Sequence, residues 1–192
     1  MKRSLTALLI AFALMIAGCS ENNTEEPDMK AHIHEKGGFK IEYPKDWEVQ
    51  TRRDGEIYSL FSSIDGKAQF KVNALPIAQG AGLDQFVALQ KRYLGEKWPG
   101  IRFIAQENTV FGGMNGKVLS AEFQKDGEQD LTKGEIYLGV ADSTAYRIFC
   151  FGPKANSGQN TPVFKKMLDS FSITGIPRFK DASKTTGGQA TG

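Results

Sequence analysis

Apolar and polar residues follow two different periods along this chain. In Phe39-Lys40-Ile41-Glu42-Tyr43 they alternate one by one, which is typical of a strand with one buried face. From Leu83 to Lys97 the apolar residues fall three and four positions apart without an internal proline, which predicts an amphipathic helix. Strand-like stretches cover residues 39–43, 47–49, 57–61, 68–75, 101–110, 116–123, 134–140 and 145–151.

Short polar turns separate these expected strands. Asp65-Gly66 is a hairpin signal between residues 57–61 and 68–75. The strands that follow residue 100 are also joined by short turns, which predicts an antiparallel meander. Residues 112–116 are rich in glycine, but a phosphate-binding loop needs a helix directly after its glycines. A strand follows here instead, so a turn is the better interpretation.

A second helix is expected near the C-terminus. Thr161 is a favoured N-cap residue and Pro162 a favoured first helical residue, and apolar side chains then recur at helical spacing up to Phe171. Strands in runs, with one helix among them and one at the end, predict an α+β fold in which helices pack on an antiparallel β-sheet. We find no internal repeat and no second domain.

The N-terminus reads as an export signal. Lys2 and Arg3 precede an almost wholly apolar run of 12 residues, Leu5 to Ile16. A transmembrane helix needs about 20 such residues. The length and the flanks of this run therefore favour a cleaved signal peptide.

The end of that run carries a more specific pattern. Ile16-Ala17-Gly18-Cys19 resembles the lipobox of bacterial lipoproteins. The resemblance implies that residues 1–18 are removed and that Cys19 is the lipid-attachment residue, bearing acyl chains such as palmitate. Ser20 after the cysteine is compatible with transfer to the outer membrane, facing the periplasm. An unlipidated secreted protein with a free Cys19 is the alternative.

The chain after Cys19 divides into three expected parts. Residues 20–36 are polar, charged and broken by Pro27, so we expect residues 19–37 to be the lipidated cysteine and a flexible tether. The folded domain is expected at residues 38–176. Residues 177–192 are polar and rich in glycine, which predicts a disordered tail.

The charge balance excludes one class of partner. The chain holds 24 Lys and Arg against 22 Asp and Glu, and Lys2 and Arg3 of the export signal account for the excess. The exported chain is thus formally neutral. A nucleic-acid-binding surface needs clustered Lys and Arg in excess, so we expect no nucleic-acid partner.

Few residues are suited to catalysis or metal binding. Apart from Cys19, the one cysteine is Cys150, which lies in a strand-like run and is expected to act as a small buried hydrophobe. His32 and His34 lie two residues apart in the tether, and a real metal site needs three or four ligands. We therefore expect no catalytic residue, no metal site and no cofactor.

Four carboxylates keep an enzymatic alternative open. Glu122, Glu128, Asp130 and Glu135 fall on or near neighbouring expected strands. A pair of carboxylates within about 5–10 Å in a cleft could hydrolyse envelope material. Charged residues on the solvent faces of strands explain the same pattern. The expected domain contains no histidine, so Ser–His and Cys–His catalysis lack a base.

Two aromatic patterns resemble a known family. Phe39-x-Ile41-x-Tyr43-Pro44-x-x-Trp47 resembles the opening of PsbP-like domains, where it begins the first hairpin. Phe164-x-x-Met167-Leu168-x-Ser170-Phe171-x-Ile173 resembles their final helix and its exit, and the DcrB-like bacterial lipoproteins share this fold. The resemblance implies an α/β/α sandwich over residues 38 to about 175, used as a non-enzymatic module. Trp47 and Phe171 are expected to be core residues.

These expectations favour a membrane-anchored, non-catalytic binding or scaffolding module of the cell envelope, with an envelope protein as partner. Such a module predicts an exposed patch with apolar or aromatic side chains. A small-molecule- or metal-binding lipoprotein is the alternative, and a cavity above about 300 Å³ would support it. An envelope hydrolase that uses carboxylates is the third hypothesis.

Overall fold

The computed structural model of the 192-residue chain describes residues 27–52, 57–78, 80–125, 127 and 129–179. The expected export signal, residues 1–18, and the expected lipid attachment at Cys19 lie outside the described residues, as do residues 180–192 of the expected tail. Glu128, one of the four candidate carboxylates, lies outside them as well.

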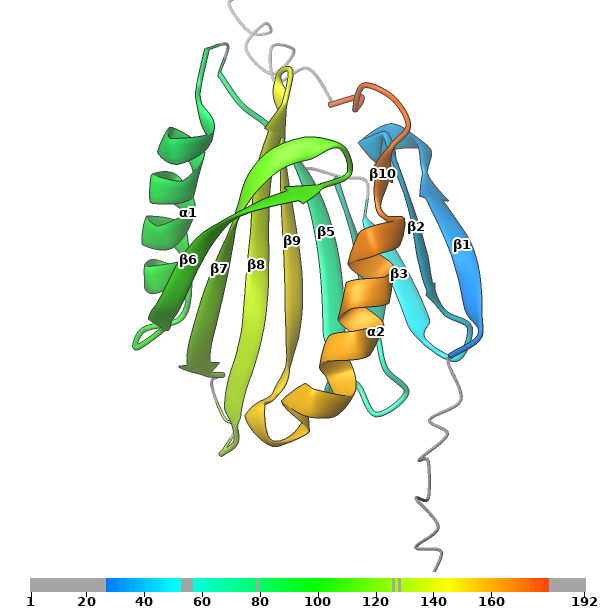
Figure 1. The fold of residues 1–192 in the computed structure, drawn as a ribbon, viewed down its shortest axis with the longest axis vertical. Coiled ribbons are helices and arrows are strands. Elements are labelled where there is room, and N and C mark those ends of the chain that lie inside the picture. The colour runs from blue at the N-terminus through cyan, green and yellow to red at the C-terminus, as the bar shows by residue number, and fades with distance from the viewer. Residues whose placement is uncertain (1–26, 53–56, 79, 126, 128, 180–192) are drawn as a thin grey trace, which may run out of the picture.

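Seven strands form the main sheet, and every neighbouring pair is antiparallel (Figure 1). In spatial order they are β3 (Glu48–Arg52), β4 (Ile57–Ser62), β5 (Gln69–Pro76), β9 (Thr144–Pro153), β8 (Leu131–Ala141), β7 (Met114–Gln124) and β6 (Arg102–Phe111). The order β6–β7–β8–β9 is the expected meander. The turn between β4 and β5 contains Gly66 at φ 69°, as its hairpin signal predicts.

A second sheet has three strands, with β2 (Phe39–Pro44) between β1 (Met29–His34) and β10 (Ser172–Ile173). A 3₁₀ turn, η1 (Glu35–Gly37), connects β1 to β2. Two expectations are wrong here. Residues 29–37 are structured, because β1 pairs with β2 along its whole length, so they are not part of a tether. Phe39–Pro44 and Glu48–Arg52 belong to different sheets and form no hairpin.

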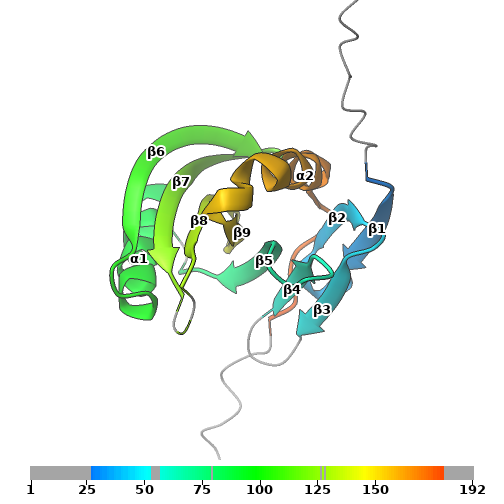
Figure 2. The same cartoon turned by 90° about the horizontal axis from the view of Figure 1, so that it is seen from below.

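The two helices lie on opposite faces of the main sheet. α1 (Leu83–Lys97) has the predicted bounds, and its Phe86, Val87 and Leu94 pack against β7, β8 and β9. α2 (Ser157–Ser170) covers the other face together with the small sheet (Figure 2). The fold is therefore α+β with helices on antiparallel sheets, as expected. Trp47 and Phe171 are buried in the core shared by α2 and both sheets, also as expected.

The start of α2 differs from the prediction. The 3₁₀ turn η2 (Lys154–Asn156) leads directly into the helix, so Asn156 holds the N-cap position. Thr161 lies inside the helix, where its hydroxyl donates a hydrogen bond to the Ser157 carbonyl at 2.7 Å. Pro162 also lies inside the helix and not at its first position, so it has no N–H to bond the Gly158 carbonyl and costs the helix one hydrogen bond.

The chain after β10 stays attached to the domain for several residues. The Arg178 N–H donates to the Lys36 carbonyl at 2.8 Å, Pro177 is buried and Phe179 packs against the core. Residues 177–179 therefore do not belong to a disordered tail, because an apolar side chain and a backbone hydrogen bond hold them. Among the described residues, no helix is both long and apolar enough to cross a membrane.

Candidate functional site

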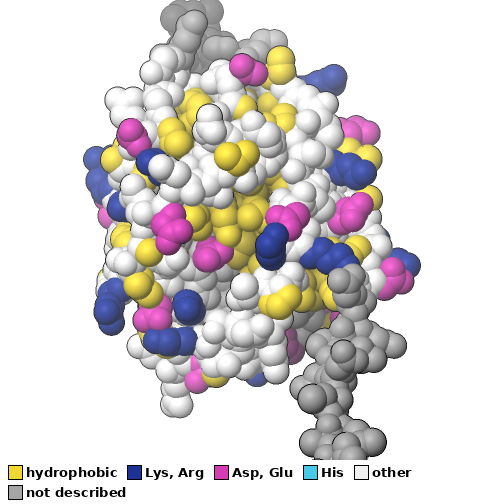
Figure 3. All heavy atoms as spheres, viewed as in Figure 1, with side chains coloured by type: hydrophobic (Ala, Val, Ile, Leu, Met, Phe, Trp, Pro, Cys, Tyr) yellow, Lys and Arg dark blue, Asp and Glu magenta, His cyan; other side chains and the backbone are white. Residues whose placement is uncertain are grey.

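A groove runs between α2 and the edge of the main sheet. Its walls are β6 on one side and α2 on the other, its floor is formed by β7, β8 and β9, and its volume is about 660 Å³. Figure 3 shows this face, with a hydrophobic patch in a hollow that acidic and basic side chains flank. We call it the β6–α2 groove. Its volume lies within the range typical of ligand pockets.

The groove exists because the sheet curls. Seen end-on, β6 and β7 arch over β8 and β9 toward α2 (Figure 2). A bulge between Phe103 and Ala105 bends β6 near its start. At the other end the Phe111 ring packs on Tyr137 and Phe171. A Cβ on Gly116 would lie 2.6 Å from that ring, so glycine at this position lets Phe111 fold inward onto the core.

The floor combines polar groups with small and aromatic side chains. Ser120, Glu135 and Cys150 lie side by side on β7, β8 and β9. The Tyr137 hydroxyl donates a hydrogen bond to the Glu135 carboxylate. Burial, followed by this hydrogen bond, raises the pKa of Tyr137. Burial also raises the pKa of the Cys150 thiol, which is 3% exposed, so this thiol stays protonated and is a poor nucleophile.

The α2 wall is apolar where it faces the floor and charged along its rim. Phe164 and Leu168 line the groove, and Lys165 pairs with Asp169 one turn later at 2.5 Å. The ionisable side chains that line the groove with those two are Lys133, Glu135, Tyr137 and Cys150. The two lysines balance the two carboxylates, so the interior of the groove carries no net charge.

Two of the exposed large apolar residues of the described chain line this groove. On β6, Ile104 is 53% and Val110 is 69% exposed, and both line the opening. Exposing apolar side chains around a concave surface to water is unfavourable in free energy. Such surfaces commonly mark interaction sites.

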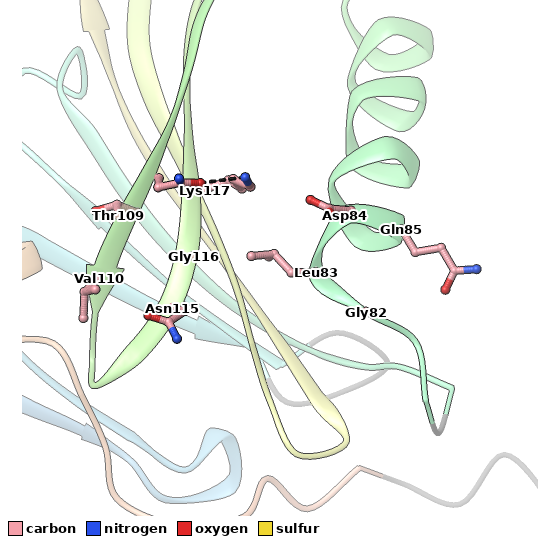
Figure 4. Close-up of a pocket in the computed structure, with 10 residues that line it drawn as sticks. Gly82, Leu83, Asp84, Gln85, Thr109, Val110, Asn115, Gly116 and Lys117 are labelled. Atoms are coloured by element: carbon pink, nitrogen blue, oxygen red, sulfur yellow. Dashed lines mark hydrogen bonds between the residues drawn. The ribbon is translucent and has the colours of Figure 1, made fainter.

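Two other hollows are less suited to a ligand. An open trough of about 860 Å³ lies between the start of α1 and the β6–β7 hairpin (Figure 4). Leu83 and Val110 are its apolar side chains, and Lys117 bonds to Asn108 at 2.6 Å across its wall. A smaller hollow of about 250 Å³ lies beside His32 and His34.

The structure separates the candidate carboxylates. Glu135 lines the β6–α2 groove, whereas Glu122 forms an ion pair with Lys154 at 2.7 Å. The hydrogen bond from Lys154 lowers the pKa of Glu122, so this carboxylate stays ionised and paired with Lys154. Asp130 lies in the turn before β8 and is exposed. Of the described members of the set, therefore, one reaches the groove.

The two histidines are packed against the domain. His32 Nε2 lies 2.9 Å from Ser59 Oγ on β4, and His34 Nδ1 accepts the Gly37 N–H at 2.9 Å. Burial, followed by the neighbouring His34, lowers the pKa of His32. Among the described residues, no three His, Cys, Asp or Glu side chains are placed to hold a metal ion.

Sequence reasoning missed the groove itself. Ala105, Tyr137 and Thr161 lie far apart in the chain and meet through the curl of the sheet and the position of α2. The available signal was the two adjacent apolar pairs at the ends of this strand, Phe103-Ile104 and Val110-Phe111, which interrupt strict alternation.

Comparisons with known proteins support the fold. The sequence matches no profile of a known protein family and no curated protein. The structure is similar to that of the PsbP protein of the cyanobacterium Synechocystis (CyanoP), with a TM-score of 0.60 and 12% identity over 82% of this chain and 98% of that one. It is also similar to the Ran-binding protein Mog1p of Saccharomyces cerevisiae, with a TM-score of 0.55 and 12% identity over 78% of this chain and 97% of that one. The expected PsbP-like fold is thus confirmed.

Proposed function

We propose that this protein is a lipid-anchored, non-catalytic binding module of the bacterial cell envelope, and that it holds a partner protein in the β6–α2 groove. The observation that carries the proposal is the groove itself, a cavity of about 660 Å³ with exposed Ile104 and Val110 at its mouth. The lipobox-like sequence at Cys19 supports the anchor and, with Ser20 after it, an outer-membrane location facing the periplasm.

The chemistry of the groove favours binding over catalysis. The Glu135 carboxylate accepts a hydrogen bond from the Tyr137 hydroxyl, and Lys165 forms an ion pair with Asp169. The Cys150 thiol is protonated. General acid–base or nucleophilic catalysis needs an activated group that can reach a substrate. The fold is compatible with this role, since one protein that shares it is described as a Ran-binding protein.

A small-molecule-binding lipoprotein is the second candidate. The volume of the groove favours it, because about 660 Å³ exceeds the volume that a small ligand needs. The two candidates differ in what reaches the groove in the cell, which a crosslinking experiment can separate.

The anchor is tested by Cys19→Ala, with Ser20→Ala as the control that keeps the thiol. We expect Ser20→Ala to incorporate labelled palmitate and sediment with membranes, whereas Cys19→Ala takes up no label and leaves the membrane pellet. The physical reason is that each buried CH₂ contributes about 0.8 kcal/mol to membrane binding and Cys19 alone carries the chains. A Cys19→Ala protein of mature size in the membrane pellet would contradict the anchor.

The groove is tested by a photo-crosslinking amino acid placed at Thr109, on the groove face of β6, in living cells. The control position is Leu89 on α1, which is 51% exposed on the opposite face of the sheet. We expect a discrete protein adduct from position 109 and none of that size from position 89. Equal adducts from both positions, or none from position 109, would count against a protein partner at the groove.

A further inference from the structure

Building on the proposed function, we infer that the occupant of the β6–α2 groove is an extended segment of the partner polypeptide, which pairs with the outer edge of β6 as an added strand. The segment presents apolar side chains to the groove and a basic side chain to Glu107. This inference rests on the position of β6, on the side chains of its groove face and on their charge.

The outer edge of β6 offers a row of backbone hydrogen-bonding groups. β6 is the last strand of the seven-stranded sheet, and β7 is the strand paired with it in the described structure. Its sequence, RFIAQENTVF, contains no Pro or Lys, residues that commonly protect an edge. In Figure 1, β6 crosses in front of β8 and β9 toward α2, so this edge borders the groove. An extended peptide can therefore gain main-chain hydrogen bonds and lie in the groove at once.

The length and side chains of the edge define the segment. The bulge leaves a regular stretch from Ala105 to Val110, long enough for a strand of about 20 Å. Ala105 and Thr109 share the groove face of β6, because their register partners are Ser120 and Gly116. These small side chains leave room, and Phe164 lines the α2 side of the groove. Medium-sized apolar side chains on every second residue of the segment would fill this space.

Charge adds a further requirement. Glu107 lies between Ala105 and Thr109 on the same face, in register with Val118, and is exposed. Within the described structure it makes no ion pair or hydrogen bond through its side chain. The charges that line the interior of the groove balance one another, and Glu107, on the adjoining edge of β6, gives this edge a negative charge. A basic residue in the incoming strand, opposite Glu107, is favoured over an acidic one.

Charge also argues against a second copy of this chain. Two β6 strands that paired edge to edge in an antiparallel manner around Glu107 would bring two like charges together, which is unfavourable. The segments of the exported chain outside the described termini are equally unsuited. Their sequences, SENNTEE before Pro27 and KDASKTTGGQATG after Phe179, contain no aliphatic side chain larger than alanine. The segment therefore comes from another protein.

The test uses the full-length protein purified in detergent and short fluorescent peptides in which valine alternates with threonine around a central Lys or Glu. Binding is measured by fluorescence anisotropy. We expect the Lys peptide to bind about three- to tenfold more tightly than the Glu peptide, and Glu107→Lys to reverse this order. N-methylation of alternate backbone nitrogens, on one edge only, should weaken binding at least about tenfold, because it removes the hydrogen bonds to β6.

Matched variants locate the site. Ala105→Trp should abolish binding by filling the groove, while Gln106→Trp on the opposite face of the same strand should leave it unchanged. Thr161→Trp changes an exposed position on the α2 wall and should also block the groove. This variant replaces Ala105→Trp if the latter alters the thermal unfolding curve. Peptide binding that Thr161→Trp leaves intact would overturn the proposed location.

Three results would overturn the inference in favour of another occupant or none. The first is no saturable binding of either peptide. The second is binding of a fluorescent fatty acid, blocked by Ala105→Trp, without peptide binding. The third is a concentration-dependent dimer in analytical ultracentrifugation that Ala105→Trp abolishes. If the crosslinker at position 109 still captures a protein in any of these cases, the proposed function stands and strand addition alone is wrong.

Discussion

His32 belongs to a residue type that often binds metals or transfers protons, but in this structure it contributes to packing. Its ring contacts Phe61 and Tyr43 edge-on and bonds to Ser59, so it joins β1 to β4 across the two sheets. The sequence shows two histidines in a polar stretch and so suggests an exposed pair. It could not show the neighbours, because Ser59 and Phe61 are brought to His32 only by tertiary packing.

Acidification should therefore weaken the fold through His32. Its pKa is lowered in the folded state, so between the folded value and the unfolded value of about 6.5 the unfolded chain binds more protons. Stability is fully present above pH 6.5 or so and falls as the pH drops through that window. His32→Gln, which keeps a hydrogen-bonding group, should flatten this slope in urea unfolding measured from pH 8 to about pH 5. Identical slopes in the two proteins would show that His32 does not contribute.

The residues of the groove were also beyond sequence reasoning, for a related reason. Trp47 and Phe171 could be assigned to the core because large aromatic side chains are seldom left in water. Ala105 and Thr161 have no such bias, and nothing in their neighbours along the chain marks them. Glu135 was named as a candidate, but its hydrogen bond with Tyr137 follows from side-chain orientation on β8 rather than from spacing.

At the scale of elements, local patterns predicted most of what formed. α1 was predicted with its observed bounds, since hydrophobic period and the absence of proline are local properties. The partners of the strands were predicted only where the turns are short, as in β6 to β9. β2 pairs with β1 and β10 instead of β3, because burial of Phe39 and Ile41 under α2 outweighs proximity in the chain.

The junction of β2 and β10 depends on Gly38. Gly38 has φ 63°, and a Cβ there would lie 2.1 Å from the Gly175 carbonyl oxygen. Gly66 has a similar φ of 69° with no atom within 4 Å of such a Cβ, which makes it a matched control. Gly66→Ala should cost about 1–2 kcal/mol from backbone strain alone. Gly38→Ala should cost at least about 2 kcal/mol more, because the clash also displaces β10 and the Thr174 hydrogen bond to Gly38.

Urea unfolding of the two alanine variants measures the difference. Equal losses of stability would mean that the segment around Gly175 moves aside without cost, and that β10 contributes little to the fold.

At the scale of the whole molecule, the runs of strands and the two helices in the sequence predicted the α+β class. They did not predict that the strands divide into two sheets. Both sheets share one core with α2, which contains Phe39, Phe70, Ile148 and Phe171 from four separate strands or their ends. Contacts between residues so distant in sequence leave no local pattern. The position of α2, and with it the β6–α2 groove, depends on that core.

The chain end closes this assembly. Pro177 is buried, Phe179 packs on the core and Arg178 bonds to η1, so a chain that ends at Phe179 should be as stable as the full-length protein. A chain that ends at Gly175 should lose about 1–3 kcal/mol, from the lost apolar burial and one hydrogen bond. Urea midpoints of the two truncated chains provide the measurement. A shorter chain with an unchanged midpoint would show that residues 176–179 add nothing to stability.

The extra strand β1 also sets how far the domain can travel from its proposed anchor. Asp28, which bonds to Lys45, is the start of the folded body, and about nine residues separate it from Cys19. Nine residues can span at most about 30 Å, whereas a connection that ended at residue 38 could span about 65 Å. If Cys19 is lipidated as proposed, the domain would therefore meet partners only in a thin layer next to the bilayer. Proteins embedded in or lying against the same membrane would fall within that layer.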